Sequence, residues 1–415
     1  MIAPTAVPPS DYGVYVHIPF CAARCGYCDF ATWTDRGDQI AGYVDACVAD
    51  LHQRVERGTV ADATSVFFGG GTPSLLPAEH LARILDAIPR TTDAEVTVEC
   101  NPDAVDPAKL AAYRSSGVTR VSFGVQSMIT HVLAFLERTH DPANVARAVG
   151  WARAAGFDSF NVDLIYGTPG ESIDDWRGTL DGALALAPPH VSAYALTVEP
   201  GTPLGQRVAA GQAPAPDDDD QAEKYAIADD AFSAAGLEWY EVSNWAVPGH
   251  ECRHNLLYWS QGDYLGVGCA AHGHDRGRRW WNVRTPERYV ERIAGGASAE
   301  VGAEVLDEGT RRDEAFLLAL RTRGGVPVGA AASDEVARLV DAGLAVTSGD
   351  GLVLTRAGRL LGSDVTRRLL AAGGSGAAIH TVDMAPEPGG QRSGWHSVTS
   401  SASVTGDRPT SSLQP

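Results

Sequence analysis

The chain has 415 residues, and its 52 acidic against 33 basic residues give a formal net charge of −19. Its hydrophobic content of 44% is enough to bury a globular core, whereas the acidic balance argues against nucleic acids and anionic membranes as partners. Because the sequence has no apolar run of about 18 residues and no signal-peptide pattern at its start, we expect a cytoplasmic protein without an integral membrane segment.

From the N-terminus onward, short apolar runs alternate with longer amphipathic stretches. The runs typical of strands are Tyr12–Ile18, Ser65–Phe68, Glu95–Glu99, Arg120–Val125, Phe160–Tyr166 and Val191–Leu196. The stretches with helical spacing are Gln39–Arg57, Glu79–Ile88, Pro107–Ser116, Pro142–Ala155 and Ile173–Ala187. Six such units predict an α/β fold in which a parallel sheet with crossover helices curls into a partial (βα)6, TIM-like barrel.

Glycine-rich and polar segments follow four of the predicted strands directly. They are Gly69–Ser74, Glu99–Pro102, Gln126–Ser127 and Tyr166–Pro169. In parallel barrels the functional residues gather at the carboxyl ends of the strands. We therefore expect the site at that end of the barrel.

The chain changes character after the barrel, and five segments are expected in all. They are a disordered N-terminus (1–11), the barrel (12–240), a motif-dense segment (241–305), a C-terminal domain (306–370) and a disordered tail (371–415). The C-terminal domain is predicted to be helical, and its LVLTRAGRLL run resembles a winged helix. Because the chain is acidic and this unit lacks a basic helix, a packing role is favoured over DNA binding.

Three of the seven cysteines crowd into eight residues directly after the first predicted strand, as Cys21, Cys25 and Cys28. Their C-x3-C-x2-C spacing allows three interpretations. A disulfide would leave one thiol over, and a structural zinc would need a fourth ligand at an unusual spacing, such as His17 or Asp29. A [4Fe-4S] cluster with three thiolates would leave one iron open to an external molecule, and this interpretation is favoured.

This cysteine loop, with Tyr27 before its last cysteine, resembles the signature of radical S-adenosylmethionine (SAM) proteins. The wider set of motifs is similar to the coproporphyrinogen III dehydrogenase (HemN-like) group, and most of all to its HemW branch, whose members are proposed haem chaperones. The motifs are YVHIPFC, FGGGTPS, ECNP, SFGVQS, LERTH, DLIYGTPGE and YEVSNWA-x-PGHECRHNLLYW-x5-YLGVGCAAHG. The resemblance covers about residues 15–370.

The resemblance implies a cofactor set and a site. Cys21, Cys25 and Cys28 would bind a [4Fe-4S] cluster whose fourth iron is chelated by SAM. The turn containing Gly71 and Thr72 would meet the SAM amino group, and Tyr27 would lie along the adenine. The other positions that match SAM contacts are Tyr15, Glu99, Gln126, Arg138, Asp163 and Ala195.

The HNLLYW motif adds a possible haem site. His254 opens it and is a candidate axial ligand, the alternative being a structural hydrogen-bonding role. Cys252 and Cys269 lie nearby and are interpreted as buried apolar residues rather than ligands. Cys47 and Cys100 are expected in the core.

Two departures from the HemN enzymes favour a chaperone. Those enzymes have a fourth cysteine two residues after the third, where this chain has Phe30, and they carry a longer N-terminal extension. We therefore expect a haem chaperone that transfers haem to an acceptor protein and uses an electron donor for its cluster, with no assigned catalytic residue. The alternative is oxygen-independent oxidative decarboxylation of coproporphyrinogen III to protoporphyrinogen IX.

Overall fold

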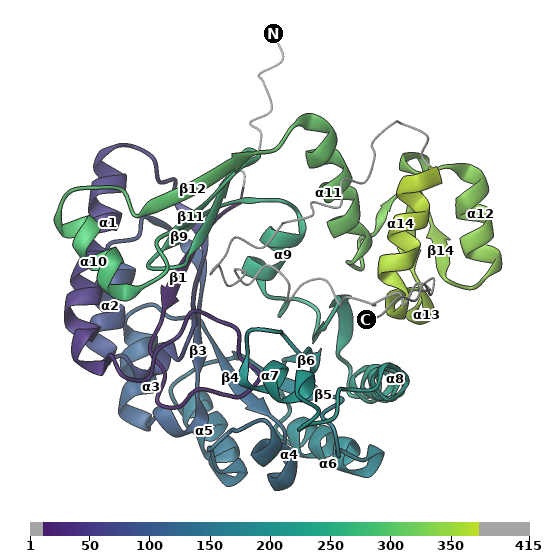
Figure 1. Cartoon of the computed structure of the whole chain (residues 1–415), viewed down its shortest axis with the longest axis horizontal. Coiled ribbons are helices and arrows are strands. Elements are labelled where there is room, and N and C mark those ends of the chain that lie inside the picture. The colour runs from purple at the N-terminus through teal and green to yellow at the C-terminus, as the bar shows by residue number, and fades with distance from the viewer. Residues whose placement is uncertain (1–10, 373–415) are drawn as a thin grey trace, which may run out of the picture.

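The computed structural model describes residues 11–372, and a single twelve-stranded sheet organises most of them (Figure 1). Its strand order is β12-β11-β10-β9-β1-β2-β3-β4-β5-β6-β8-β7. The six consecutive strands β1 to β6 lie side by side and are all parallel. The predicted partial (βα)6 barrel is therefore confirmed, with further strands on both of its sides.

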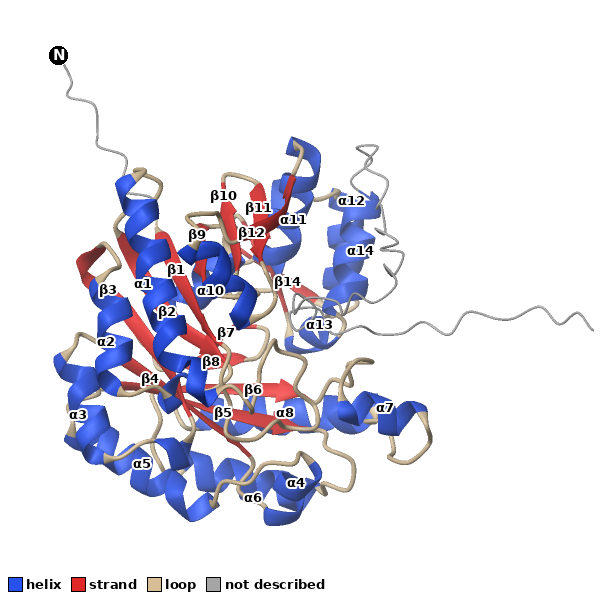
Figure 2. Cartoon of the chain, turned by 60° about the vertical axis from the view of Figure 1, so that its left-hand side comes forward, coloured by secondary structure: helices blue, strands red, loops and turns tan. Residues whose placement is uncertain are grey.

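The barrel is built from six strands and the helices between them. The strands are β1 (Tyr12–Ile18), β2 (Ala63–Gly70), β3 (Arg90–Cys100), β4 (Arg120–Gln126), β5 (Ser159–Tyr166) and β6 (His190–Ala195). The helices are α1 (Ile40–Glu56), α2 (Ala78–Asp86), α3 (Pro107–Ser115), α4 (Thr130–Phe135), α5 (Pro142–Ala154) and α6 (Ile173–Leu184). Helices α1, α2, α3, α5 and α6 cover one side of the strands (Figure 2). Each lies within a few residues of its predicted range.

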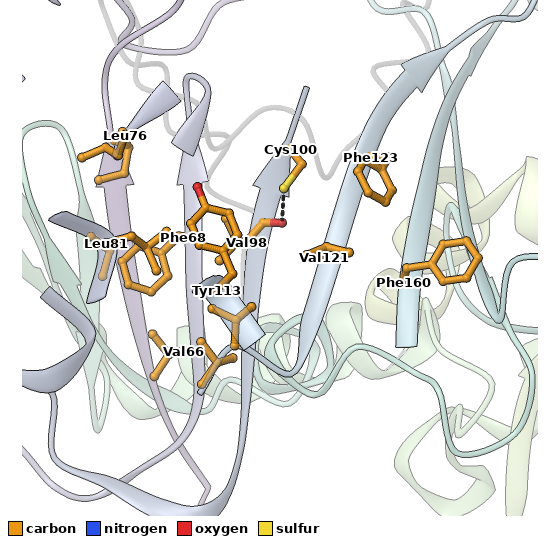
Figure 3. Close-up of a cluster of buried hydrophobic side chains, with 14 of the residues drawn as sticks. Val66, Phe68, Leu76, Leu81, Val98, Cys100, Tyr113, Val121, Phe123 and Phe160 are labelled. Atoms are coloured by element: carbon orange, nitrogen blue, oxygen red, sulfur yellow. Dashed lines mark hydrogen bonds between the residues drawn. The ribbon is translucent and has the colours of Figure 1, made fainter. Parts of the chain in front are cut away.

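The main core lies between the strands and these helices (Figure 3). Alternate residues of each strand point to it, so Val66 and Phe68 of β2 pack beside Val98 of β3 and Val121 of β4. Cys100 belongs to the same cluster, and its thiol donates to the Val98 carbonyl over 3.6 Å. Cys47 is fully buried as well, so both cysteines are core residues as predicted.

Strands of the motif-dense segment, 241–305, extend the barrel sheet at both edges. β7 (Glu238–Glu241) and β8 (Asn244–Ala246) continue the sheet beyond β6, and β8 pairs antiparallel with β6. On the other side, β9 (Asp263–Val267) runs parallel to β1. The sheet then continues through β10 (His272–Asp275), β11 (Arg278–Asn282) and β12 (Glu300–Val305), all antiparallel.

The helices after the barrel are α7 (Pro203–Ala209), α8 (Asp218–Ala234), α9 (Arg253–Trp259) and α10 (Pro286–Ala294). The C-terminal region has its own apolar cluster and a three-stranded sheet, in the order β13-β15-β14. Its elements are α11 (Glu308–Leu320), β13 (Val326–Pro327), α12 (Ser333–Asp341), β14 (Ala345–Ser348), β15 (Gly351–Leu354), α13 (Arg356–Leu360) and α14 (Gly362–Ala372). The helix α14 extends two residues into the predicted tail, whose remainder, like residues 1–10, lies outside the described residues.

Candidate functional site

The cysteine loop follows β1 at its carboxyl end, and backbone hydrogen bonds fix its path. Cys21 N donates to Trp33 O over 3.0 Å, and the Gly26 carbonyl accepts from Leu204 N over 2.8 Å. Cys21, Cys25 and Cys28 are partly exposed, whereas the other four cysteines of the described chain are buried. Exposure alone therefore separates the three motif thiols from the rest.

Two side chains donate to the sulfur atoms of this loop. Thr72 Oγ1 lies 3.7 Å from Cys21 Sγ, and Arg138 Nη1 lies 3.6 Å from Cys25 Sγ. Burial raises the pKa of the Cys28 thiol to about 12 and raises the pKa of Cys21 as well. Because thiolates are the metal-binding form, these cysteines need a bound cation to be held deprotonated.

The cysteine loop offers three thiols to a metal centre. Within residues 11–372, no three His, Cys, Asp or Glu side chains converge closely enough to hold a single metal ion. In a [4Fe-4S] cluster with three cysteine ligands, each cysteine binds a different iron and one iron stays open to an external molecule. The three thiols, with a neighbouring arginine and hydroxyl as donors, fit that group.

The glycine turn after β2 is fastened to the cysteine loop. Gly71 N donates to Ile18 O and Thr72 N to Phe20 O, both over 2.8 Å. A Cβ atom at Gly71 would lie 2.7 Å from Phe20 O and 3.0 Å from Cys21 Sγ. Only glycine fits this position without moving the cysteine loop.

Two half-buried carboxyl groups lie on the inner face of the barrel, away from the helices. Gly70 N donates to Glu99 Oε2 over 3.1 Å, and burial together with the nearby Asp163 raises the pKa of Glu99 to about 8. Asp163 accepts from Ser122 Oγ and Asn161 Nδ2 over 2.8 and 2.7 Å, and burial raises its pKa too. A cationic or hydroxyl-bearing ligand would stabilise both as carboxylates.

Arg138, Gln126 and Gly124 meet at the end of β4. Arg138 Nη2 donates to Gly124 O over 2.6 Å, and its buried Nε has no partner within the protein. Gln126 has a φ of +65° where the register between β4 and β5 shifts, so the strand bends at this point. A bend and an arginine with an unused donor are both typical of ligand sites.

The remaining predicted contacts lie around this end of the sheet. Tyr15 OH is 3.0 Å from His17 Nδ1, and Ala195 ends β6 opposite Tyr166 of β5. Tyr27 lies close enough to Cys25 and Arg138 to interact electrostatically with both. The structure thus brings the predicted cluster and SAM positions together at the carboxyl ends of β1 to β6.

His254 lies elsewhere, at the opposite end of the barrel. Its side chain is 1% exposed beside the beginnings of β1 and β2, with its ring stacked on Phe67. Nδ1 is 2.9 Å from Ser65 Oγ and Nε2 is 2.9 Å from Tyr258 OH. Burial lowers its pKa to about 3. Iron binding by His254 would require one of these bonds to break and α9 to move.

Cys252 and Cys269 are buried, as expected for apolar packing. The Cys252 thiol donates to Glu95 Oε1 over 3.5 Å, and Cys269 Sγ accepts from Tyr43 OH over 3.6 Å. Burial raises the pKa of Cys269 to about 12. Neither sulfur contacts the cysteine loop.

Sequence reasoning missed the side chains that hold Asp163. Ser122, Asn161 and Ser192 lie on neighbouring strands, and Asn161 Nδ2 bonds both serine hydroxyls at 2.8 and 2.9 Å. A signal was present, because polar residues recur at every second position of β4 and β5. That period predicts one polar face, which here is the inside of the barrel.

Comparison with known proteins agrees with the motifs. Residues 15–183 match the Radical SAM superfamily. The heme chaperone HemW of Mycobacterium tuberculosis (strain H37Rv) is 46% identical over 376 residues, which cover 88% of this chain and 96% of that protein. The Escherichia coli heme chaperone HemW is 40% identical over 63% of this chain and 69% of its own length.

Among solved structures, E. coli coproporphyrinogen III oxidase (HemN), a radical SAM enzyme, superposes with a TM-score of 0.76. It is 21% identical, and the alignment covers 88% of this chain and 91% of HemN. At this identity the likeness concerns the fold, which extends beyond the barrel into the later segments.

Proposed function

We propose that this chain, which belongs to the HemW family of radical SAM proteins, binds haem and transfers it to an acceptor protein. The observation that carries the proposal is the 46% identity to a heme chaperone along 96% of that protein's length. Such coverage includes the cysteine loop, the barrel and the segment after it. The proposal therefore concerns a whole protein rather than a shared domain.

As a radical SAM protein, the chain uses a [4Fe-4S] cluster and SAM. When reduced, the SAM-bound cluster supplies one-electron cleavage of SAM. Cys21, Cys25 and Cys28 would hold the cluster, with Thr72 and Arg138 donating to two of their sulfur atoms. These donors stabilise the thiolates and keep the loop in one conformation.

The SAM positions proposed from the sequence have chemistry that suits that molecule. Glu99 and Asp163 are half-buried carboxyl groups, which can accept hydrogen bonds from an ammonium group or a ribose hydroxyl. Arg138 suits the SAM carboxylate because its guanidinium can donate two parallel bonds. Gly71, Gln126, Tyr15, Tyr27 and Ala195 would complete the surface around it.

Coproporphyrinogen III dehydrogenation has weaker support. HemN shares the fold, but Phe30 replaces the fourth cysteine of the HemN pattern, and its side chain is 44% exposed beside the cysteine loop. The other four cysteines of the described chain are buried, whereas the three of the loop are partly exposed. We therefore propose that the cluster and SAM serve haem handling.

The proposed partners are haem, a haem-accepting protein and an electron donor for the cluster. Among residues 11–372, no helix is both long enough and apolar enough to span a bilayer. We propose that the transfer takes place in the cytoplasm, with no nucleic acid involved, in keeping with the net charge of −19.

The test is haem loading and release by the full chain after anaerobic cluster reconstitution. A chaperone should bind haem saturably and pass it to apomyoglobin, used as a haem-accepting probe, and transfer should depend on the cluster-containing protein. Serum albumin loaded with haem is the control for nonspecific release. A Soret spectrum unchanged from that of free haem would refute the proposal.

A further inference from the structure

Cross-strand pairing places one residue from each of six neighbouring strands in a single row. Directly paired residues point to the same face of a sheet. Two recorded pairs join Tyr15 to Phe67 and to Gly266, and two more join Trp281 to His272 and to Gly302. Between β9 and β10, the pair Tyr264–His274 sets His272 opposite Gly266. In strand order the row is Phe67, Tyr15, Gly266, His272, Trp281 and Gly302.

The row continues the inner face of the barrel outward from Tyr15, which we assign to SAM. Gly266 adds no side chain between Tyr15 and His272. At the outer end, a Cβ atom at Gly302 would lie 2.3 Å from Trp281 Cζ2, so the indole ring lies over the β12 backbone. Trp281 is nevertheless 38% exposed, and its ring lies 6.2 Å from that of His272, tilted by 35°. An exposed flat ring thus stands next to an imidazole.

His272 differs from the buried histidines of the sheet in its exposure. His17, His190 and His274 of the strands, and His254 of α9, are at most 6% exposed. His272 is partly exposed, and burial of the rest of the ring lowers its pKa to about 4. At neutral pH the ring is therefore uncharged, which is the form that binds iron.

We propose that haem binds against this row, with His272 as the axial ligand of the iron and Trp281 as an apolar contact of the macrocycle. The inference rests on the proposed haem-chaperone function and names the site of its cargo. Haem is a flat, largely apolar ring whose iron takes a histidine ligand, and these two residues offer both interactions. The cargo would then lie on the same face as Tyr15, beside SAM, and His254 would be a packing residue of α9.

The experiment is a ferric haem titration of the full, cluster-reconstituted chain and three histidine variants. His272→Gly should bind haem at least about tenfold more weakly and lose the Soret band of a histidine-ligated haem. Added imidazole should restore that band, because it can occupy the place of the missing ring. The matched control is His131→Gly, whose side chain is 58% exposed on α4, and it should titrate like the wild type. His254→Gln should retain the band in its folded fraction.

Several outcomes would overturn the site. One is an unchanged titration of His272→Gly. Another is loss of the band only in a His254→Gln variant that keeps its cluster absorbance and circular dichroism. If His272→Gly fails to fold, Trp281→Leu replaces it, and this variant should weaken binding several-fold while keeping the histidine-ligated spectrum. Unchanged affinity of Trp281→Leu would then count against the site. Failure of the wild type to bind haem would instead refute the proposed function, so the two failures are distinguishable.

Discussion

The two ends of the barrel carry the same kinds of residue, but at one end they are partly exposed and at the other they are hydrogen-bonded within the protein. At the carboxyl ends of the strands, the cysteines of the loop are partly exposed and Glu99 accepts a single bond, from Gly70 N. At the other end, Cys252 and the His254 backbone share Glu95 Oε1, and the His254 ring is bonded at both nitrogens. A cysteine, a histidine and a glutamate are present at this end too, but their polar groups already have hydrogen-bonding partners within the protein.

This difference shows how the same chemistry can serve binding or stability. Buried polar groups that pair within the protein hold elements together, here α9 against β1 and β2. Those with unused capacity, such as Arg138 Nε, are available for a ligand. A distinctive sequence motif alone does not tell whether its residues bind a ligand or stabilise the fold, because HNLLYW is as distinctive in sequence as the cysteine loop.

The largest expected effect is on the cysteine loop, at the carboxyl ends of the strands. Cys25→Ser should abolish the visible absorbance of the reconstituted cluster, because a hydroxyl is a poor ligand for iron–sulfur centres. Cys100→Ala, in the core, should keep that absorbance and lose only stability, by about 1 to 2 kcal/mol. Iron and sulfide analysis of both proteins checks the prediction, and a full cluster in Cys25→Ser would contradict it.

Gly71→Ala should have the next largest effect, because its Cβ would press on the Phe20 carbonyl and Cys21 Sγ. We expect most of the cluster to be lost and the free energy of unfolding to fall by about 2 to 3 kcal/mol. Gly42→Ala in α1 is the control, since nothing lies within 4 Å of its Cβ. That variant should gain about 0.5 to 1 kcal/mol. Equal cluster content in the two variants would contradict the role of Gly71 in holding the cysteine loop in place.

At the other end of the barrel, His254→Ala should reduce the free energy of unfolding by about 2 to 4 kcal/mol. The change leaves a cavity, and it leaves the hydroxyls of Ser65 and Tyr258 without their histidine partner. Cluster content should stay unchanged in the folded protein. Urea denaturation of the variant is compared with that of His52→Ala, an exposed change on α1 that should cost less than about 0.5 kcal/mol. If both variants unfold at the same urea concentration, the packing role of His254 is excluded.

The smallest effect concerns pH. Since burial and the nearby Asp163 raise the pKa of Glu99 to about 8 in the folded protein, well above that of an exposed glutamate, the folded state holds a proton that the unfolded state has lost. The free energy of unfolding should therefore fall as the pH rises from about 5 to about 8. Glu99→Gln removes that loss, so the protein without cofactors should gain on the order of 2 kcal/mol relative to wild type between about pH 5 and pH 8. Parallel pH profiles of the two proteins would contradict the assignment.

The barrel was predictable from local patterns, and the rest of the sheet was not. Alternating apolar runs predict the six strands in order, and the amphipathic spacing between them predicts five of the helices. The division of 241–305 between the two sheet edges depends on pairing between distant strands, such as β9 with β1. No local period encodes that choice.

The same limit applied within the site. The cysteine spacing predicts the cluster ligands, whereas the contact of Arg138 with Cys25 joins residues 113 positions apart. The engagement of both His254 nitrogens likewise depends on Ser65, 189 residues away. Whether a histidine is available to a ligand is decided by such distant partners, and sequence motifs do not record them.

The most direct test of the haem-chaperone assignment uses one preparation for two measurements. The anaerobically reconstituted chain is incubated with SAM, a reductant and coproporphyrinogen III, and haem is titrated into a second portion. We predict saturable haem binding and no protoporphyrinogen IX. Repeated turnover of coproporphyrinogen III to protoporphyrinogen IX, without saturable haem binding, would contradict the assignment.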